Sequence, residues 1–217
     1  ALEKIKEKDN IVRISEFNAM IASLIAAENA PFIYERIGTR LQHYLLDEFQ
    51  DTSRLQWSNL IPLVYDAISQ QKENLIVGDP KQAIYRFRNG LVEQFVALPG
   101  IYNPENDKKI SETSKYFESM GHKKPLDTNF RSKKDIIEFN NHFFEQALEL
   151  MPEEFKHYYA DVQQNVKNQD RGYVQITLHD KSQKNDYETI LREYLLKTVS
   201  ECEKDGYHRS DICILVR

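Results

Sequence analysis

Residues 43–53 read His43-Tyr44-Leu45-Leu46-Asp47-Glu48-Phe49-Gln50-Asp51-Thr52-Ser53, and this stretch decides the fold of the 217-residue chain. The short apolar run predicts a buried β-strand that ends abruptly in two carboxylates, Asp47 and Glu48. In open α/β sheets, ligands bind at the carboxyl ends of the strands, so an acid pair at this position can be functional. An acid pair alone could also be a solvated strand end, and the choice depends on the sequence downstream.

A second apolar run, Asn74-Leu75-Ile76-Val77, is followed by Gly78-Asp79-Pro80-Lys81-Gln82. The segment between the two runs predicts a helix, which Pro62 should kink or break. Its apolar stripe consists of Trp57, Leu60, Ile61, Val64 and Ile68. Strand, helix and strand in this order indicate a parallel sheet with a right-handed crossover. The predicted fold class is therefore α/β, with parallel sheets flanked by helices.

An acid pair at the end of such a strand suits the hydrolysis of a nucleoside triphosphate. Asp47 would hold Mg²⁺, and Glu48 would orient and deprotonate the attacking water. Gln82 follows the second strand, where its amide could meet the γ-phosphate or that water, although the local sequence also allows a plain turn residue.

The next segment, Tyr85-Arg86-Phe87-Arg88, interleaves aromatic residues with arginines. An exposed ring offers a stacking surface for an unpaired base, and an arginine adds a phosphate or cation–π contact. The alternative for Phe87 is a place in the core, although Tyr85 is the better candidate for that role.

A third string, Leu126-Asp127-Thr128-Asn129-Phe130-Arg131-Ser132, completes a pattern. With Asp-Glu-Phe-Gln-Asp-Thr at 47–52 and Gly-Asp-Pro-Lys-Gln-Ala-Ile-Tyr at 78–85, it resembles motifs II, III and IV of superfamily 1 DNA helicases of the UvrD/Rep group. The first two strings are closest to the RecB/AddA type, the exonuclease V β-subunit branch. The resemblance is strongest over residues 14–144.

This resemblance implies ATP and Mg²⁺ as cofactors, with Asp47 as the magnesium ligand. Gln82 would couple the nucleotide to the DNA site, and Phe87 would stack on single-stranded DNA. Arg86 and Arg88 would lie at the DNA site, and Arg88 would also contact neighbouring acids. The family commonly continues with Gly-Ala, whereas this chain has Asn89-Gly90, so the path of the loop stays open.

The third string would act from a second domain. By resemblance, Phe130 would stack on the adenine, and Arg131 would reach the γ-phosphate as an arginine finger when the two domains close. Residues 1–124 would be the C-terminal part of a first RecA-like motor domain, and residues 125–217 the N-terminal part of a second. An irregular connection over 99–125, with a short helix near 114–120, would join them.

The chain contains no P-loop pattern, Gly-x-x-x-x-Gly-Lys-Ser/Thr. It is therefore expected to be an internal piece of a larger motor protein and to be inactive as an ATPase by itself. Within residues 125–217, Ser132 with Asp135 predicts a capped helix start. Strands are predicted over 172–179 and 212–216.

Composition limits the other classes of function. The net charge is −5, so any DNA site must be local rather than a property of the whole surface. Two cysteines indicate neither a disulfide framework nor a metal site. Neither a signal peptide nor an apolar run of membrane-spanning length occurs, which predicts a cytoplasmic protein without a membrane partner.

The function implied by the resemblance is an ATP-dependent DNA helicase that couples ATP hydrolysis to movement on single-stranded DNA. Its partners would be single- and double-stranded DNA and a further subunit of a helicase–nuclease for double-strand-break repair. Translocation from 3′ to 5′ is also implied by the resemblance alone. Two alternatives stay open: a UvrD/Rep-like helicase without a nuclease, and a non-catalytic DNA-binding subunit with a decayed motor.

Overall fold

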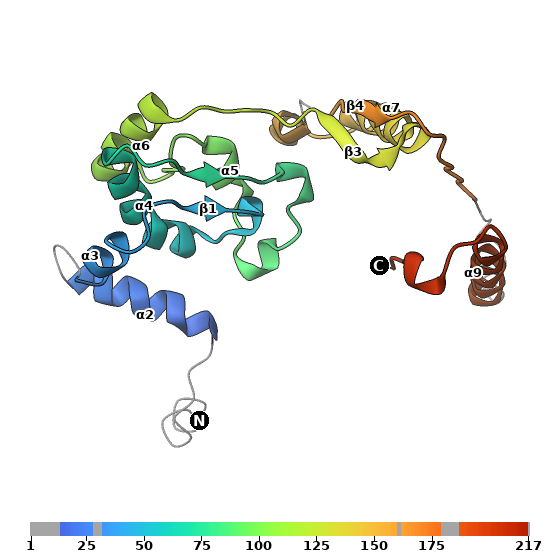
Figure 1. The fold of residues 1–217 in the computed structure, drawn as a ribbon, viewed down its shortest axis with the longest axis horizontal. Helices are drawn as coiled ribbons and strands as arrows, with labels where there is room; N and C mark the ends of the chain where they lie inside the picture. The colour runs from blue at the N-terminus through green and yellow to red at the C-terminus, as the bar shows by residue number, and fades with distance from the viewer. Residues whose placement is uncertain (1–13, 28–31, 160–161, 179–186, 217) are drawn as a thin grey trace, which may run out of the picture. The chain divides into compact units, whose positions relative to one another are not determined.

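The computed structural model describes residues 14–27, 32–159, 162–178 and 187–216. The chain divides into two compact units, Ala1–Gly172 and Tyr173–Arg217. Helices and short strands alternate along the first unit (Figure 1), as predicted for the α/β class. The proposed boundary between motor lobes at 124/125 falls inside this unit and stays a prediction.

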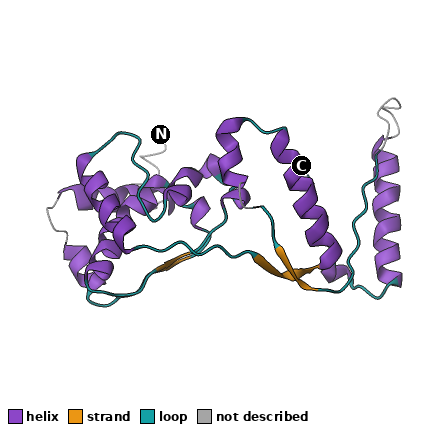
Figure 2. Ribbon diagram, turned by 90° about the horizontal axis from the view of Figure 1, so that it is seen from above, coloured by secondary structure: helices purple, strands orange, loops and turns teal. Residues whose placement is uncertain are grey.

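The first sheet consists of two short parallel strands, β1 (Leu45–Leu46) and β2 (Leu75–Ile76). Leu45 pairs with Leu75 and Leu46 with Ile76, so the segments after both strands leave the sheet at the same edge. Helix α4 (Arg54–Ser69) forms most of the connection, which confirms the predicted strand–helix–strand order. Figure 2 shows how short the strands, in orange, are beside the helices, in purple.

Helix α4 begins at a complete capping box. The Ser53 hydroxyl accepts a hydrogen bond from the Gln56 backbone N–H, and the Gln56 side chain accepts one from the Ser53 N–H. The helix runs through Pro62 to Ser69, so the break considered at Pro62 does not occur.

The main hydrophobic cluster of the first unit packs α4 against Phe49, Ile101 and Phe117. The rings of Phe49 and Trp57 meet edge to face at 4.9 Å, and Phe117 packs at 6.5 Å from Trp57. Phe49 thus anchors the acid pair's own segment in the core. The buried apolar residues of this cluster are Tyr44, Phe49, Trp57, Leu63, Val64, Ala67, Ile101 and Phe117.

Further helices surround this core. Helices α2 (Ile14–Ala27) and α3 (Phe32–Gly38) both contact α4, and the Tyr34 hydroxyl donates to the Asn59 carbonyl at 2.8 Å. After β2 come the 3₁₀ turns η2 (Pro80–Gln82) and η3 (Arg86–Arg88), then α5 (Val92–Ala97). Helix α6 (Lys108–Met120) is longer than the helix predicted near 114–120, and the Asp107 carboxylate caps it.

The last part of the first unit holds a second parallel pair, β3 (Thr128–Lys133) with β4 (Asn165–Asn168). Helix α7 (Lys134–Glu149), α8 (Glu153–Lys156) and η4 (His157–Tyr159) lie between them in sequence. The predicted cap at Ser132 is wrong, because Ser132 belongs to β3 and α7 starts two residues later. The Asp135 carboxylate instead accepts the Gly172 N–H at 2.9 Å.

The second unit contains α9 (Tyr187–Lys204) and the turn η5 (Arg209–Asp211). The sequence predicts strands over 172–179 and 212–216. The structure describes residues 172–178 and 212–216 of these ranges, and none of them forms a strand. Most of their apolar side chains are exposed, among them Leu178 and Leu215. A strand needs a partner to bond its backbone groups, and sequence alternation does not supply one.

Candidate nucleotide and DNA site

Asp47 and Glu48 follow β1 directly, and both are exposed. Glu48 adopts a left-handed backbone conformation, with φ 50° and ψ 39°. Two hydrogen bonds hold this bend: the Glu48 N–H donates to Asp47 Oδ1 at 2.9 Å, and the Phe49 N–H donates to the Val77 carbonyl at 3.1 Å. A left-handed conformation is costly for a residue with a Cβ and persists only where its surroundings enforce it, often at functional sites.

Gln50 connects the acid pair to the segment after β2. Its side chain is 1% exposed. The amide Nε2 donates to Glu48 Oε2 at 2.6 Å, and the amide Oε1 accepts the Asp79 N–H at 3.1 Å. Sequence reasoning missed this residue, because its only signal was a polar side chain between core positions.

The Asp79 carboxylate binds polar groups of Lys81 and Gln82 in the segment after β2. Its Oδ1 accepts the Lys81 N–H at 3.0 Å and lies 2.8 Å from Lys81 Nζ, while its Oδ2 accepts Gln82 Nε2 at 3.0 Å. Burial alone would raise the pKa of Asp79, but the hydrogen bonds from Lys81 and Gln82 and the Lys81 charge outweigh it and lower this pKa below its ordinary value. Asp79 is therefore a stable anion that holds Gln82 near the acid pair's segment.

The donor set around Asp47 fits Mg²⁺ bound together with a nucleotide. Mg²⁺ is commonly held by one or two carboxylates plus substrate phosphates. In the described part of the chain, no group of three or more His, Cys, Asp or Glu side chains could form a complete protein cage for a metal. An exposed Asp47 with Glu48 beside it could provide one oxygen ligand and a base, provided that phosphates complete the shell.

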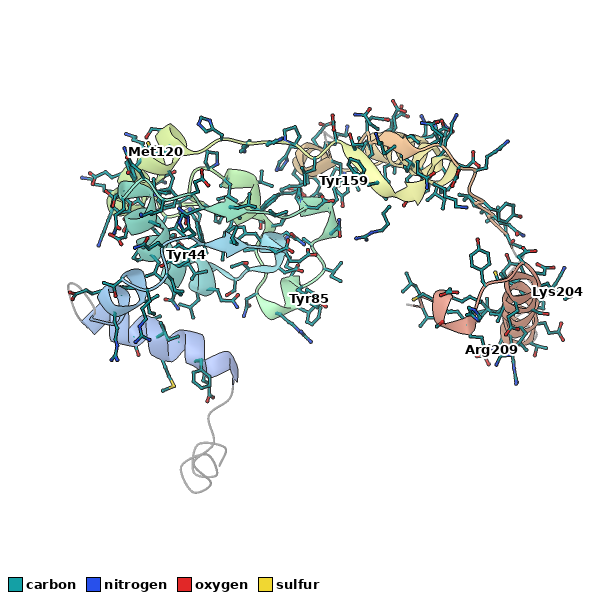
Figure 3. All side chains as sticks on the ribbon, viewed as in Figure 1. Tyr44, Tyr85, Met120, Tyr159, Lys204 and Arg209 are labelled. Atoms are coloured by element: carbon teal, nitrogen blue, oxygen red, sulfur yellow. The ribbon has the colours of Figure 1, made fainter. Side chains whose placement is uncertain are left out.

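The segment 85–88 presents its aromatic and basic groups to solvent. Phe87 is 77% exposed, and its ring lies 5.8 Å from that of Tyr85 (Figure 3 labels Tyr85). The Arg88 guanidinium lies over both rings, 5.1 Å from Tyr85 and 5.5 Å from Phe87. Arg86 forms the contact to an acid, with its Nη2 2.6 Å from Glu93 Oε1. Phe87 is thus not a core residue, and a base could reach its ring.

The end of this loop is fixed to the residues that follow the acid pair. Gly90 forms an isolated antiparallel bridge with Ser53, and the Leu91 N–H donates to the Thr52 carbonyl at 3.2 Å. Gln94, 2% exposed, donates its Nε2 to the same carbonyl at 3.0 Å. A Cβ on Gly90 would meet the Tyr85 carbonyl oxygen at 3.1 Å and Asp51 backbone atoms at 3.2 and 3.3 Å. The glycine allows this close approach, and neither Gly90 nor Gln94 was singled out from the sequence for it.

Phe130 and Arg131 lie on β3 and are exposed. The Asn129 side chain shapes this strand, because its Oδ1 accepts the Arg131 and Ser132 N–H groups at 3.0 and 2.8 Å. Its Nδ2 donates to Gln164 Oε1 at 2.8 Å. Among the described residues, the Arg131 guanidinium has no ion pair or hydrogen bond, so nothing joins it to the acid pair.

The structure therefore connects one group of predicted residues and leaves the other apart. Glu48 and Gln82 are linked through Gln50 and Asp79, with Asp47 next to them. The aromatic loop is attached to the same segment through Thr52. Within the described part of the chain, Phe130 and Arg131 take no part in this network.

A family model and several curated proteins are similar to parts of this chain. Residues 1–103 match the UvrD/REP helicase N-terminal domain. The matched range includes the acid pair, Gln82 and Phe87. The assignment of motif IV and the position of the chain inside a larger protein stay predictions.

Several curated proteins match part of the chain and carry helicase/nuclease or RecB names. The chain is 34% identical to an ATP-dependent helicase/nuclease subunit of Lysinibacillus sphaericus over 109 residues, which are 50% of the chain and 8% of the relative. It is 32% identical to the RecBCD enzyme subunit RecB of Mycobacterium tuberculosis over 102 residues, 46% of the chain and 9% of the relative. With the helicase/nuclease subunit of Latilactobacillus sakei it shares 28% over 153 residues, 69% of the chain and 15% of the relative. The chain thus spans a small part of the length of each of these relatives.

Proposed function

We propose that this chain forms part of the motor of an ATP-dependent DNA helicase, which couples ATP hydrolysis to movement on single-stranded DNA. The observation that carries the proposal is the hydrogen-bonded series Glu48–Gln50–Asp79–Gln82 at the shared edge of β1 and β2. It joins the Glu48 carboxylate, which would be the base, to the Gln82 amide, which would sense the phosphate. The UvrD-like match over residues 1–103 supports this interpretation.

In this mechanism Asp47 would hold Mg²⁺ with the nucleotide's phosphates, and the magnesium ion would supply charge neutralisation at those phosphates. Glu48 would orient the attacking water and take its proton. Its Oε2 accepts from Gln50, while its Oε1 has no hydrogen bond among the described residues and can receive that proton. Gln82 would contact the γ-phosphate or the water after exchanging its bond to Asp79.

The DNA site would be the exposed loop at 85–88. A base would stack on Phe87, with Arg86 and Arg88 next to the backbone phosphates. Arg131, with Phe130 on the adenine, would complete the nucleotide site only when a second lobe closes, and this contact would let ATP favour the closed state. We further propose that the motor belongs to a helicase–nuclease with a partner subunit, because relatives carry the names ATP-dependent helicase/nuclease subunit and RecBCD enzyme subunit. We also propose that it acts in the cytoplasm in double-strand-break repair.

The test uses the full-length protein and the variant Glu48→Gln. This nearly isosteric change keeps Asp47 in place, so ATP binding should persist while DNA-stimulated hydrolysis slows by about 10²–10⁴-fold, as for a lost general base. Glu112→Gln on α6 is the matched control, because Glu112 is an exposed glutamate of that helix and should tolerate the change.

The alternatives have distinct outcomes in the same experiment. A wild-type protein that binds DNA without DNA-stimulated hydrolysis would indicate a non-catalytic subunit. Hydrolysis and unwinding without degradation of linear duplex DNA, even in the presence of its partner, would indicate a helicase without a nuclease. Normal turnover by Glu48→Gln would show that Glu48 is not the base.

A further inference from the structure

We propose that Gln50 is a positioning residue, which orients the Glu48 carboxylate as a base and fixes it to the segment that carries Gln82. The inference rests on the proposed function, because it concerns how Glu48 is prepared to accept a proton. Gln50 itself has its polar atoms engaged with protein groups and is 1% exposed, so it acts through Glu48.

The orientation of the Gln50 amide follows from its two neighbours. The Asp79 backbone N–H can only donate, so it must face the amide oxygen Oε1. An ionised Glu48 carboxylate can only accept, so it must face the amide nitrogen Nε2. Both requirements are met at once, and a flipped amide would meet neither. Glutamine supplies a donor and an acceptor on one planar group, which neither glutamate nor leucine does.

Gly78 provides the space that the amide occupies. A Cβ on Gly78 would lie 2.6 Å from Gln50 Oε1, 3.0 Å from Phe95 Cε2 and 3.3 Å from the Phe49 nitrogen. The glycine after β2 therefore lets the Gln50 side chain cross from the β1 segment to the β2 segment. The close approach of Gly78 to Gln50 is an observation separate from the hydrogen bonds. It also shows that the Gln50 side chain lies between the segments after β1 and β2.

The position of Gln50 has a direct consequence for Glu48. The buried Gln50 amide holds one oxygen of the Glu48 carboxylate, Oε2, at 2.6 Å. This hydrogen bond fixes the orientation of the carboxylate, whose backbone is in the left-handed conformation. The other oxygen is left for the water. Asp79 Oδ2 accepts a hydrogen bond from Gln82 Nε2, so a shift of Gln82 towards a phosphate would break this bond. The Asp79 N–H donates to Gln50 Oε1, so the change at Asp79 would reach Gln50. Gln50 thus makes the base sensitive to the position of Gln82.

The experiment compares Gln50→Glu with Gln70→Glu in the full-length protein. Both glutamines donate Nε2 to a carboxylate, but Gln70 donates to Asp66 Oδ2 at 2.8 Å, outside the site, and not to Glu48. Gln50→Glu keeps the shape and turns the donor into an acceptor that faces a carboxylate. We expect kcat for ATP to fall by about 10- to 100-fold, the size of a lost hydrogen bond to a charged group, with little change in KM. Gln70→Glu puts the same new charge beside a carboxylate and should leave kcat unchanged.

A second background separates a positioning role from a structural one. In Glu48→Gln the base is already lost, so adding Gln50→Glu should reduce kcat by less than about threefold, a non-additive result for coupled residues. Gln50→Leu removes the donor without adding a charge and should also lower kcat selectively, which provides a readout if Gln50→Glu folds poorly.

Each outcome decides one question. Two results would overturn the positioning role. One is an equal loss of kcat from Gln50→Glu in the wild-type protein and in the Glu48→Gln variant. The other is an unchanged kcat in both Gln50→Glu and Gln50→Leu. If Glu48→Gln itself has normal turnover, the proposed function fails first. If Glu48→Gln is impaired and the Gln50 variants are normal, only this inference fails.

Discussion

Phe87→Ala tests whether the exposed ring serves DNA or the fold. A fully buried aromatic side chain removes about 150–250 Å² from solvent. Since Phe87 is 77% exposed, alanine removes only about a quarter of that burial. At about 25 cal/mol per Å², the free energy of unfolding should fall by about 1 kcal/mol. A core aromatic such as Phe49, which is 0% exposed, would instead cost about 3–5 kcal/mol.

The expected loss is in DNA affinity. Removal of a base-stacking ring weakens single-strand binding by about 1–3 kcal/mol, which is roughly a 5- to 150-fold higher Kd. The assay is fluorescence anisotropy of a labelled oligothymidine with the full-length protein at fixed salt, combined with urea unfolding. Phe143→Ala on α7 is the matched control, because Phe143 is also a largely exposed phenylalanine and lies outside the loop. It should leave DNA affinity unchanged.

Two results would refute this reasoning. Unchanged DNA affinity in a folded Phe87→Ala protein would remove the stacking role. A stability loss of about 3–5 kcal/mol would show that the ring is buried in the full-length protein.

Four further predictions concern the same geometry. Gly78→Ala should destabilise the chain by about 1–3 kcal/mol in urea unfolding, because its Cβ would collide with Gln50 Oε1. The lowered pKa of Asp79 stabilises the fold above the ordinary aspartate pKa, and this contribution is lost as pH falls through the lowered value, so Asp79→Asn should flatten the acid end of a stability–pH curve. The 217-residue chain alone should show no DNA-stimulated phosphate release, and release abolished by Asp47→Ala would contradict this. Arg131→Ala in the full-length protein should reduce turnover far more than initial nucleotide binding, since its contact forms as lobes close; equal losses would refute the finger role.

The sequence predicted the position of the acid pair because hydrophobic runs report strand ends. Leu45–Leu46 and Leu75–Ile76 form the expected parallel pair, and Glu48 and Gln82 follow at the same edge. The Gln50 bridge could not be predicted in this way. A polar residue's partner depends on the register between two strands, and hydrophobic periodicity does not encode the hydrogen bonds of a buried amide.

The errors have equally physical causes. Ser132 has the residue type of a helix cap, but its N–H bonds to Asn129 and its strand pairs with β4, so the chain stays extended past it. Residues 212–216 have the composition of a core strand, yet composition provides no partner for their backbone groups. Local signals thus identified which residues prefer a conformation, and tertiary pairing determined whether they adopted it.

The hydrogen bonds after β1 also constrain how a motor could work. Gln50 attaches the segment after β2 to Glu48, and Thr52 receives both the Leu91 N–H and the Gln94 amide. The predicted nucleotide residues and the aromatic loop therefore share one short anchoring segment, residues 49–53. Relative motion between them would break several partly buried hydrogen bonds, each of which costs free energy to leave unmade. We therefore expect the nucleotide site and the aromatic loop to move together as one rigid body. The large displacement in each ATP cycle would then occur between this rigid body and the rest of the protein.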